Sequence, residues 1–302
     1  MQHTVHCLLS TILILLVCFG FFTGCQPQKK SKQTSFFEWT DDYGRHVSLK
    51  EEPMRIVSLS PAITEIIYLI GAQDKLVAVS EYCTYPNETK KLPKVGGMQN
   101  VNMEALLELH PDVVLIGSIV SKKDVETIEK MNVPVITVKE EGKMEGMADK
   151  IDVIGKITHH ERQAAQQSMW WRESVKQMKA KNNRREGKSI SVYYVVGFGD
   201  AGDYTAPKSS HIHEIIELAG CENVGATLTS WNVSREFLFQ SNPDIILIRK
   251  EDYQSFCSQY PYTMLNAVEA GHVYPIESGW IDVVSPRNIQ AVELIQQCAR
   301  EM

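Results

Sequence analysis

The sequence predicts an α/β fold of two similar lobes, each built on a mostly parallel sheet and joined by one long helix. Three observations support this prediction. Short apolar runs alternate with helical stretches, two segments recur in the same order, and a long polar helical stretch separates the copies. The chain has 302 residues, of which 43% are hydrophobic and 23% charged, as in an ordinary globular protein.

Charge and cysteine content exclude several classes of protein. The formal net charge of -6 indicates no basic surface for a nucleic-acid partner. The composition is also unlike that of a disordered or multi-span membrane protein. Seven cysteines are too few for a disulfide scaffold in a chain of this length.

The N-terminus has the features of a targeting segment. The apolar run at residues 8–22 fits the core of a signal peptide and is too short for a spanning helix of about 20 residues. It ends in Phe22-Thr23-Gly24-Cys25, which resembles a bacterial lipoprotein processing site. We therefore expect residues 1–24 to be a lipoprotein signal peptide and Cys25 to be lipidated. An uncleaved anchor helix is the alternative.

A polar segment follows the expected lipidation site. Residues 25–35 lack periodicity, which predicts a flexible tether. The folded part would then lie outside the cytoplasm, held at the membrane through Cys25, in the periplasm or at the outer face of the cell membrane. Disulfides can form in such a compartment, and Cys221 and Cys298 are one pair that could be joined.

The N-terminal lobe is expected at residues 36–142. Two alternating runs flank Asp41-Asp42-Tyr43-Gly44, which predicts a leading hairpin. After Pro53 the pattern becomes strand, helix, strand, helix, with Ser60-Pro61 marking the start of the first helix. Buried parallel strands are predicted within residues 55–60, 76–79, 113–116 and 133–138.

Two segments of this lobe recur in the C-terminal lobe, which is expected at residues 187–302. Residues 65–71 resemble residues 214–220, and each copy follows an apolar strand. Residues 104–116 resemble residues 236–248, and in both copies a Glu stands seven positions before Pro-Asp and a strand follows. Two matches in the same order indicate two similar α/β lobes.

A helical linker is expected between the lobes, at residues 143–186. Apolar residues within 161–181 follow helical spacing and predict a helix about 30 Å long. Residues 161–181 contain no Gly and only two Ser, unlike a flexible hinge, so we expect a stiff connection between the lobes.

The ordered motifs resemble the iron-chelate and cobalamin substrate-binding proteins of ABC importers. The matching segments are residues 55–61 with Thr64-Glu65, then 81–86, 94–97, 102–104, 111–114, 233–236, 243–244 and 285–287. The resemblance implies the class III binding-protein fold, with two Rossmann-like lobes, one interlobe helix and a ligand in the cleft. It also implies a monomer that is not an enzyme, a permease dimer with its ATPase subunits as partner, and no cofactor beyond the transported cobalt or iron chelate.

The same resemblance implies roles for two acidic residues. In this family one acid on each lobe docks onto arginines of the permease dimer, and the matching positions are Glu104 and Glu236. The repeat places these two residues at equivalent points of the two lobes, which suits a two-fold symmetric partner. The alternative is that each Glu simply begins a helix, where the dipole favours negative charge.

Ligand-binding residues are expected in loops that follow strands, because open α/β sheets bind ligands there. The candidates are Tyr82, Tyr85, Met98, Phe198, Tyr204, Trp231, Trp280 and Arg287. Large aromatic side chains suit the wall of a site for a flat macrocycle or chelate. The alternative is that several of them are ordinary core residues.

The nature of the ligand stays open at this point. Cobalamin or another corrinoid, and a ferric siderophore that meets Arg287, are the leading possibilities. Haem is an alternative, with an axial ligand from Tyr82, Tyr85, Met98 or His211. A free-metal-ion binder and an enzyme acting on a metal chelate are further alternatives. We expect no resident metal site, because His211-Ile212-His213 falls at a predicted helix start, and no nucleophile–base motif is apparent.

Overall fold

The computed structural model describes residues 35–302 except 42, 118–119, 139–143, 145 and 183–188. The expected signal peptide, the lipidated Cys25 and all of the tether except residue 35 therefore lie outside the described residues. Within the described part of the chain, no helix is both long enough and apolar enough to span a membrane.

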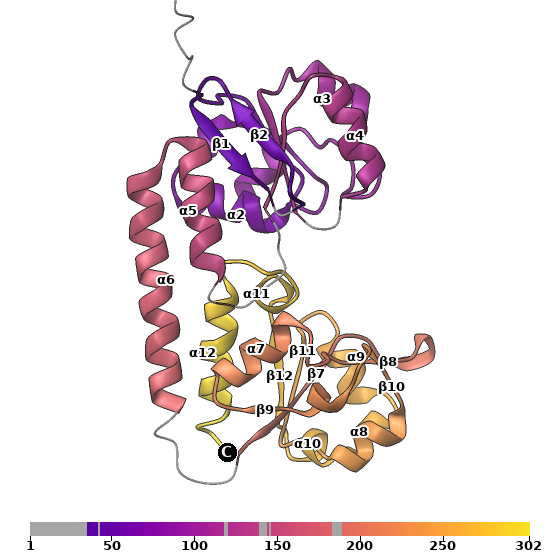
Figure 1. Cartoon of the computed structure of the whole chain (residues 1–302). Coiled ribbons are helices and arrows are strands. Elements are labelled where there is room, and N and C mark those ends of the chain that lie inside the picture. Colours follow the sequence, from indigo (N-terminus) through magenta and orange to yellow (C-terminus); the bar gives the residue numbers. More distant parts are fainter. Residues whose placement is uncertain (1–34, 42, 118–119, 139–143, 145, 183–188) are drawn as a thin grey trace, which may run out of the picture. The chain divides into compact units, whose positions relative to one another are not determined.

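The N-terminal lobe, coloured from indigo to magenta in Figure 1, has a four-stranded parallel sheet with the order β4-β3-β5-β6. Its strands are β3 (Ile56–Ser58), β4 (Leu76–Val79), β5 (Val113–Ile116) and β6 (Val135–Thr137). Its helices are α2 (Pro61–Leu69), α3 (Met103–Glu108) and α4 (Lys122–Lys130), with 3₁₀ turns at Gln73–Lys75 and Asn87–Lys91. The expected leading hairpin is formed by the antiparallel strands β1 (Phe37–Thr40) and β2 (His46–Leu49).

The C-terminal lobe has a second four-stranded parallel sheet, with the order β12-β11-β7-β9. Its strands are β7 (Ser191–Val195), β9 (Glu222–Asn223), β11 (Ile245–Arg249) and β12 (Val273–Ile276). A small antiparallel ribbon joins β8 (Asp203–Tyr204) to β10 (Asn232–Val233). The helices are α7 (His211–Leu218), α8 (Arg235–Ser241), α9 (Tyr253–Ser258), α10 (Asn266–Glu269), α11 (Ser278–Ile281) and α12 (Asn288–Cys298), with 3₁₀ turns at Gly199–Ala201, Val224–Thr227 and Tyr262–Met264.

The two parallel sheets share one topology. Counted along the chain within each lobe, the spatial order is second, first, third and fourth strand: β4-β3-β5-β6 in one lobe and β9-β7-β11-β12 in the other. The recurring segments also fold alike. Helices α2 and α7 begin at the capping residues Ser60 and Ser210, and each is followed by a glycine with φ of +80°, Gly71 and Gly220. The predicted two-lobe α/β fold is therefore confirmed.

The predicted long connecting helix is confirmed as α6 (Glu161–Asn182), and a shorter helix, α5 (Gly146–Thr158), precedes it within the predicted linker. Helix α6 has 22 residues and is about 33 Å long. It packs against α7 of the C-terminal lobe and against α5, which in turn packs against α2 of the N-terminal lobe. The close contact of α5 with α6 requires Gly155, because a Cβ there would lie 2.2 Å from that of Ala164.

The largest hydrophobic core is continuous through these connecting helices. It contains buried side chains of both lobes, such as Ile67 on α2, Ile215 on α7 and Ile295 on α12, together with Trp171 on α6. Smaller clusters cover the other side of each sheet. One shared core along the connection stabilises a fixed relation between the lobes. Neither Cys221 nor Cys298 is part of a disulfide in the structure, so the bond considered from the sequence is not formed.

Candidate ligand-binding site

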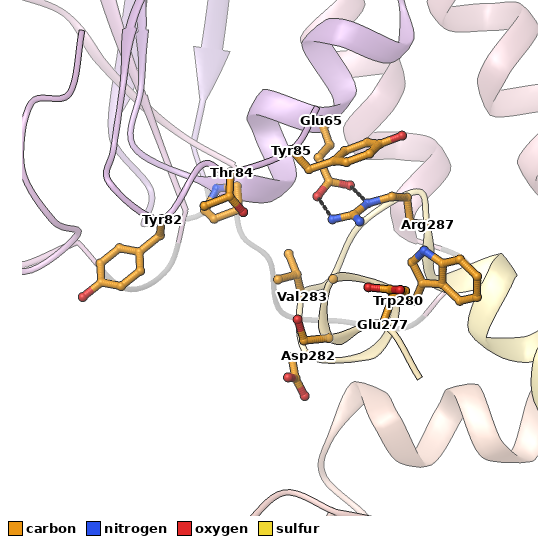
Figure 2. Close-up of a pocket in the computed structure, with 12 residues that line it drawn as sticks. Glu65, Tyr82, Thr84, Tyr85, Glu277, Trp280, Asp282, Val283 and Arg287 are labelled. Atoms are coloured by element: carbon orange, nitrogen blue, oxygen red, sulfur yellow. Dashed lines mark hydrogen bonds and ion pairs between the residues drawn. The ribbon is translucent and has the colours of Figure 1, made fainter. Parts of the chain in front are cut away.

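A cavity of about 460 Å³ lies where loops of the two lobes meet (Figure 2). The N-terminal lobe contributes Pro61, Glu65, Tyr82, Thr84 and Tyr85, and the C-terminal lobe contributes residues 277–280, Asp282, Val283 and Arg287. Its size is within the range of about 300–1,000 Å³ that is usual for small-molecule sites. It lies beyond the ends of β4 and β12, at the edge of the sheets where α/β folds bind ligands.

The N-terminal wall is a loop held by the buried Cys83. The sulfur of Cys83 lies 3.2 Å from the hydroxyls of Ser80 and Thr64, and Lys94 Nζ donates to its carbonyl oxygen at 2.9 Å. Burial raises the pKa of the Cys83 thiol, so this residue stays neutral and serves as an anchor for the loop. The two tyrosines beside it, Tyr82 and Tyr85, remain exposed by 57% and 47%.

The C-terminal wall is a loop held by the buried Asn288. Its side-chain nitrogen donates to the carbonyl oxygens of Trp280 and Val283, both at 2.8 Å, and its side-chain oxygen accepts from the backbone N–H of Ser285 at 2.9 Å. Asn288 is fully buried. A single amide at the start of α12 thus fixes the segment that carries the C-terminal cavity residues.

Arg287 joins the two walls. Its Nε donates to Glu65 Oε2 at 2.8 Å, and its Nη2 donates to Glu65 Oε1 at 2.5 Å, which makes a bidentate ion pair between the lobes (Figure 2). The guanidinium carbon also lies 3.9 Å from the centre of the Tyr85 ring. A Cβ at Gly279 would lie 2.5 Å from Arg287 Nη2, so the absence of a side chain at 279 leaves room for the guanidinium.

Two further carboxylates line the cavity, and each has its own partners. Asp282 accepts from Arg249 Nε and from the Tyr194 hydroxyl, both at 2.6 Å. Burial raises the pKa of Tyr194, and the nearby Asp282 raises it further, so the hydroxyl remains a donor at neutral pH. Glu277 accepts from Lys250 Nζ at 3.1 Å.

The structure brings together half of the ligand-binding residues predicted from the sequence. Tyr82, Tyr85, Trp280 and Arg287 line the cavity. The other four lie outside its lining. Met98 packs against the N-terminal cluster that contains Val95, and the Phe198 ring packs edge-on against Phe256 and Tyr262. Tyr204 covers Gly197 and Gly202, while Trp231 is 41% exposed.

Sequence reasoning missed four polar residues on which the site depends, Glu65, Glu277, Asp282 and Asn288. Glu65 is part of the motif and of the repeat found in the sequence. Its ion pair with Arg287, 222 positions away, could not be predicted from neighbouring residues. Glu277, Asp282 and Asn288 were not singled out. An Asn at a helix start, three residues after Ser285, favours hydrogen bonds from its side chain to the backbone. This local pattern is the signal by which Asn288 could have been found.

The two predicted docking acids occupy equivalent positions. Glu104 is the second residue of α3 and Glu236 the second residue of α8. Both helices begin with a side-chain cap, Asn102 accepting from Ala105 N at 3.1 Å and Ser234 accepting from Phe237 N at 3.2 Å. Both carboxylates are exposed. Among the described residues neither carboxylate makes a side-chain hydrogen bond or an ion pair, so both can meet a partner.

No resident metal site is evident in the described part of the chain, where no group of three or more His, Cys, Asp or Glu side chains is placed to hold an ion. His211 and His213 begin helix α7, as predicted. His211 Nε2 lies 2.7 Å from the carbonyl oxygen of Ile281, and His213 Nδ1 lies 3.3 Å from Asn223 Nδ2. Both histidines are therefore held by structural contacts.

Comparisons with known proteins agree with this architecture. The profile of the periplasmic binding protein family matches residues 56–278. The ABC transporter substrate-binding lipoprotein YvrC of Bacillus subtilis, itself uncharacterized, is 31% identical over 92% of this chain and 93% of its own length. The vitamin B12-binding protein of Vibrio parahaemolyticus is 28% identical over 82% of this chain and 90% of its own length.

A solved structure shows the same fold. The haem-binding protein HutB of Vibrio cholerae superposes with a TM-score of 0.73 over 82% of this chain and 98% of its own, at 23% sequence identity. At that identity the likeness establishes the fold alone. With the family match over most of the chain and the relative at 31% identity, the chain belongs to the periplasmic binding protein family, as a substrate-binding protein of an ABC importer.

Proposed function

We propose that this protein captures a metal chelate of the cobalamin type between its lobes and delivers it to the permease of its importer. The observation that carries the proposal is the cavity to which both lobes contribute aromatic side chains, Tyr82 and Tyr85 from one and Trp280 from the other. A vitamin B12-binding relative that aligns over 82% of this chain supports a corrinoid as ligand.

The aromatic walls suit a flat, largely apolar ring system. Each large aromatic side chain offers roughly 150–250 Å² of surface for contact. Burying the exposed ring of Tyr82 against such a ligand would be favourable. A complete corrinoid is larger than the cavity lined by these residues. We therefore propose that Met98, Phe198, Tyr204 and Trp231 contact the outer part of the ligand.

Delivery requires a docking surface on the permease side, and Glu104 and Glu236 are the proposed contacts. Both are exposed acids at the same point of two topologically identical lobes. A permease dimer with two-fold symmetry would present one matching arginine cluster to each. Exposed ion pairs contribute only about 0.2–1 kcal/mol each, so their role would be orientation and encounter rate more than affinity.

We further propose that lipidated Cys25 holds the protein at the outer face of a membrane, where it acts as a monomer. The sequence before residue 35 carries this proposal, together with the lipoprotein relative that aligns over 92% of the chain. Acyl chains anchor a soluble domain because each buried methylene contributes about 0.8 kcal/mol.

Haem is the second candidate ligand. Two tyrosines, Tyr82 and Tyr85, line the cavity, and a phenolate oxygen is a known type of axial ligand for haem iron. Tyr82 is the better placed of the two, because the ring of Tyr85 is already covered by Arg287.

A fluorescence titration separates these possibilities. Trp280 lines the cavity and is expected to be quenched when a coloured chelate binds beside it. Residues 35–302 would be titrated with cyanocobalamin, haemin, a ferric siderophore and bare Fe³⁺ and Co²⁺. We expect saturable one-to-one quenching with cyanocobalamin. Saturation with haemin alone would replace the corrinoid by haem, and saturation with bare ions alone would overturn the chelate proposal.

A further inference from the structure

We propose that Glu65 is a specificity-determining residue that sets the charge of the chelate accepted by the cavity. By holding Arg287, Glu65 leaves the lining without an uncommitted positive charge. The site would then favour chelates whose rim carries amides or hydroxyls over chelates whose rim carries carboxylates. This inference rests on the proposed function and narrows its ligand class.

The guanidinium of Arg287 is fully engaged by Glu65 and Tyr85. Two of its nitrogens donate to the two oxygens of Glu65, and the face of the guanidinium is covered by Tyr85 at 3.9 Å (Figure 2). The Glu65 side chain is only 4% exposed and that of Arg287 16%. An anionic ligand that approached Arg287 would have to displace a buried carboxylate, which would then be left without its partner.

The rest of the lining offers no replacement cation. Among the described lining residues the ionised groups are three carboxylates, Glu65, Glu277 and Asp282, and one guanidinium. Lys250 forms an ion pair with Glu277, and Arg249 forms one with Asp282, both from outside the lining. The cavity therefore presents carboxylate oxygens, which accept hydrogen bonds, to whatever enters.

This pattern matches amide rims and opposes carboxylate rims. An amide N–H donates to a carboxylate, whereas a ligand carboxylate beside Glu277 or Asp282 meets a like charge in a partly desolvated site. Cobalamin and its relatives carry amides around the corrin ring, while haem carries two propionates. Charge selection at Glu65 would therefore distinguish ligands of similar ring size.

Substitution of Glu65 by Gln tests this directly, because Gln keeps the size and one acceptor oxygen but removes the charge. Arg287 would then face an uncharged amide, and its positive charge would be available to a ligand. Two matched ligand pairs isolate the effect of charge from that of shape: dicyanocobinamide against dicyanocobyrinic acid, and haemin dimethyl ester against haemin. In each pair the ring is the same and the rim changes from uncharged to carboxylate; cobinamide differs in addition by one uncharged aminopropanol group.

We would measure the dissociation constants by fluorescence quenching for the unmodified protein, Glu65→Gln, the double variant Glu65→Gln/Arg287→Gln and the control Glu108→Gln. We expect the unmodified protein to prefer the uncharged member of the bound pair. Glu65→Gln should improve binding of the carboxylate member by about tenfold or more, the size expected for a hydrogen bond to a charged group. The double variant should lose this gain, and Glu108→Gln, on the exposed end of α3, should behave like the unmodified protein.

Three results would overturn the inference: a preference of the unmodified protein for the carboxylate member, equal changes for both members in Glu65→Gln, or a gain that persists in the double variant. If neither corrinoid binds, the proposal of a corrinoid ligand fails, but the charge preference of the cavity can still be tested with the haemin pair. Should Glu65→Gln fail to fold, which thermal unfolding would reveal, the preference of the unmodified protein decides alone.

Discussion

Arg287 and Glu65, 222 positions apart in the sequence, form a bidentate ion pair between the two lobes. Both residues line the cavity, and a continuous hydrophobic core also links the lobes. The structure therefore holds its lobes together by apolar packing and by one buried, charged contact next to the proposed ligand.

The first prediction concerns the stability of this contact. Arg287→Ala leaves the buried Glu65 carboxylate without its partner, and we expect the free energy of unfolding to fall by about 3–5 kcal/mol. Urea denaturation followed by circular dichroism measures this change. The matched control is Lys122→Ala, which breaks the exposed pair with Glu126 and should cost less than about 1 kcal/mol. Equal losses in the two variants would mean that the interlobe pair is as weak as a surface pair.

The second prediction concerns docking. Reversing both proposed contacts, Glu104→Lys with Glu236→Lys, should abolish ligand uptake by cells while leaving the dissociation constant of the ligand unchanged. Loss of favourable charge at two helix N-termini costs at most about 1 kcal/mol each, so the protein should remain folded. Glu108→Lys, at the far end of the same helix α3, is the control and should transport normally. A weakened ligand affinity in the double variant would place these acids in the binding site.

The third prediction concerns the aromatic walls. Tyr82→Ala, Trp280→Ala and Trp231→Ala should each weaken chelate binding about tenfold or more, because truncating an aromatic anchor at a binding site costs about 2 kcal/mol. Trp170→Ala is the control, since that side chain is 53% exposed on α6 and lies outside the cavity lining. If Trp231→Ala binds as well as the control, the ligand does not extend beyond the lobe–lobe cavity on that side.

The fourth prediction concerns pH. Burial lowers the pKa of His211 below its ordinary value of 6.5, although the carbonyl of Ile281 and the carboxylate of Asp282 act in the opposite direction. As pH falls below about 6.5, the unfolded chain takes up a proton that the folded protein resists, so the free energy of unfolding decreases. His211→Gln should lose this part of the pH dependence while other groups keep theirs. Parallel urea titrations at pH 7.5 and 5.5 would check it, and identical pH dependence in both proteins would refute the assignment.

The sequence predicted the fold well because its signals are local. Apolar runs fixed the strands, Ser60-Pro61 fixed the start of α2, and the recurring Glu with Pro-Asp marked the duplicated lobes whose sheets share one strand order. Within the predicted helical linker, α5 was not predicted as a separate helix, because the polar composition of residues 143–186 does not reveal that α5 packs against α2.

The site was predicted only in part, for a physical reason. Aromatic residues after strands are visible in the sequence, and three of them, Tyr82, Tyr85 and Trp280, do line the cavity. The ion pair between Arg287 and Glu65 forms only in the tertiary structure. The sequence therefore suggested that Arg287 was available to an anionic chelate. The lipidated Cys25 remains a prediction, because it lies outside the described residues.

The most direct test of the account is isothermal titration calorimetry of residues 35–302 with cyanocobalamin, repeated with the double variant Tyr82→Ala/Trp280→Ala. We expect one site per chain and a negative heat-capacity change, because apolar surface is buried on both lobes. We also expect that the double variant loses most of the affinity while its thermal unfolding is unchanged. No heat of binding to cyanocobalamin, or full affinity in the double variant, would contradict the claim that a corrinoid binds between the lobes.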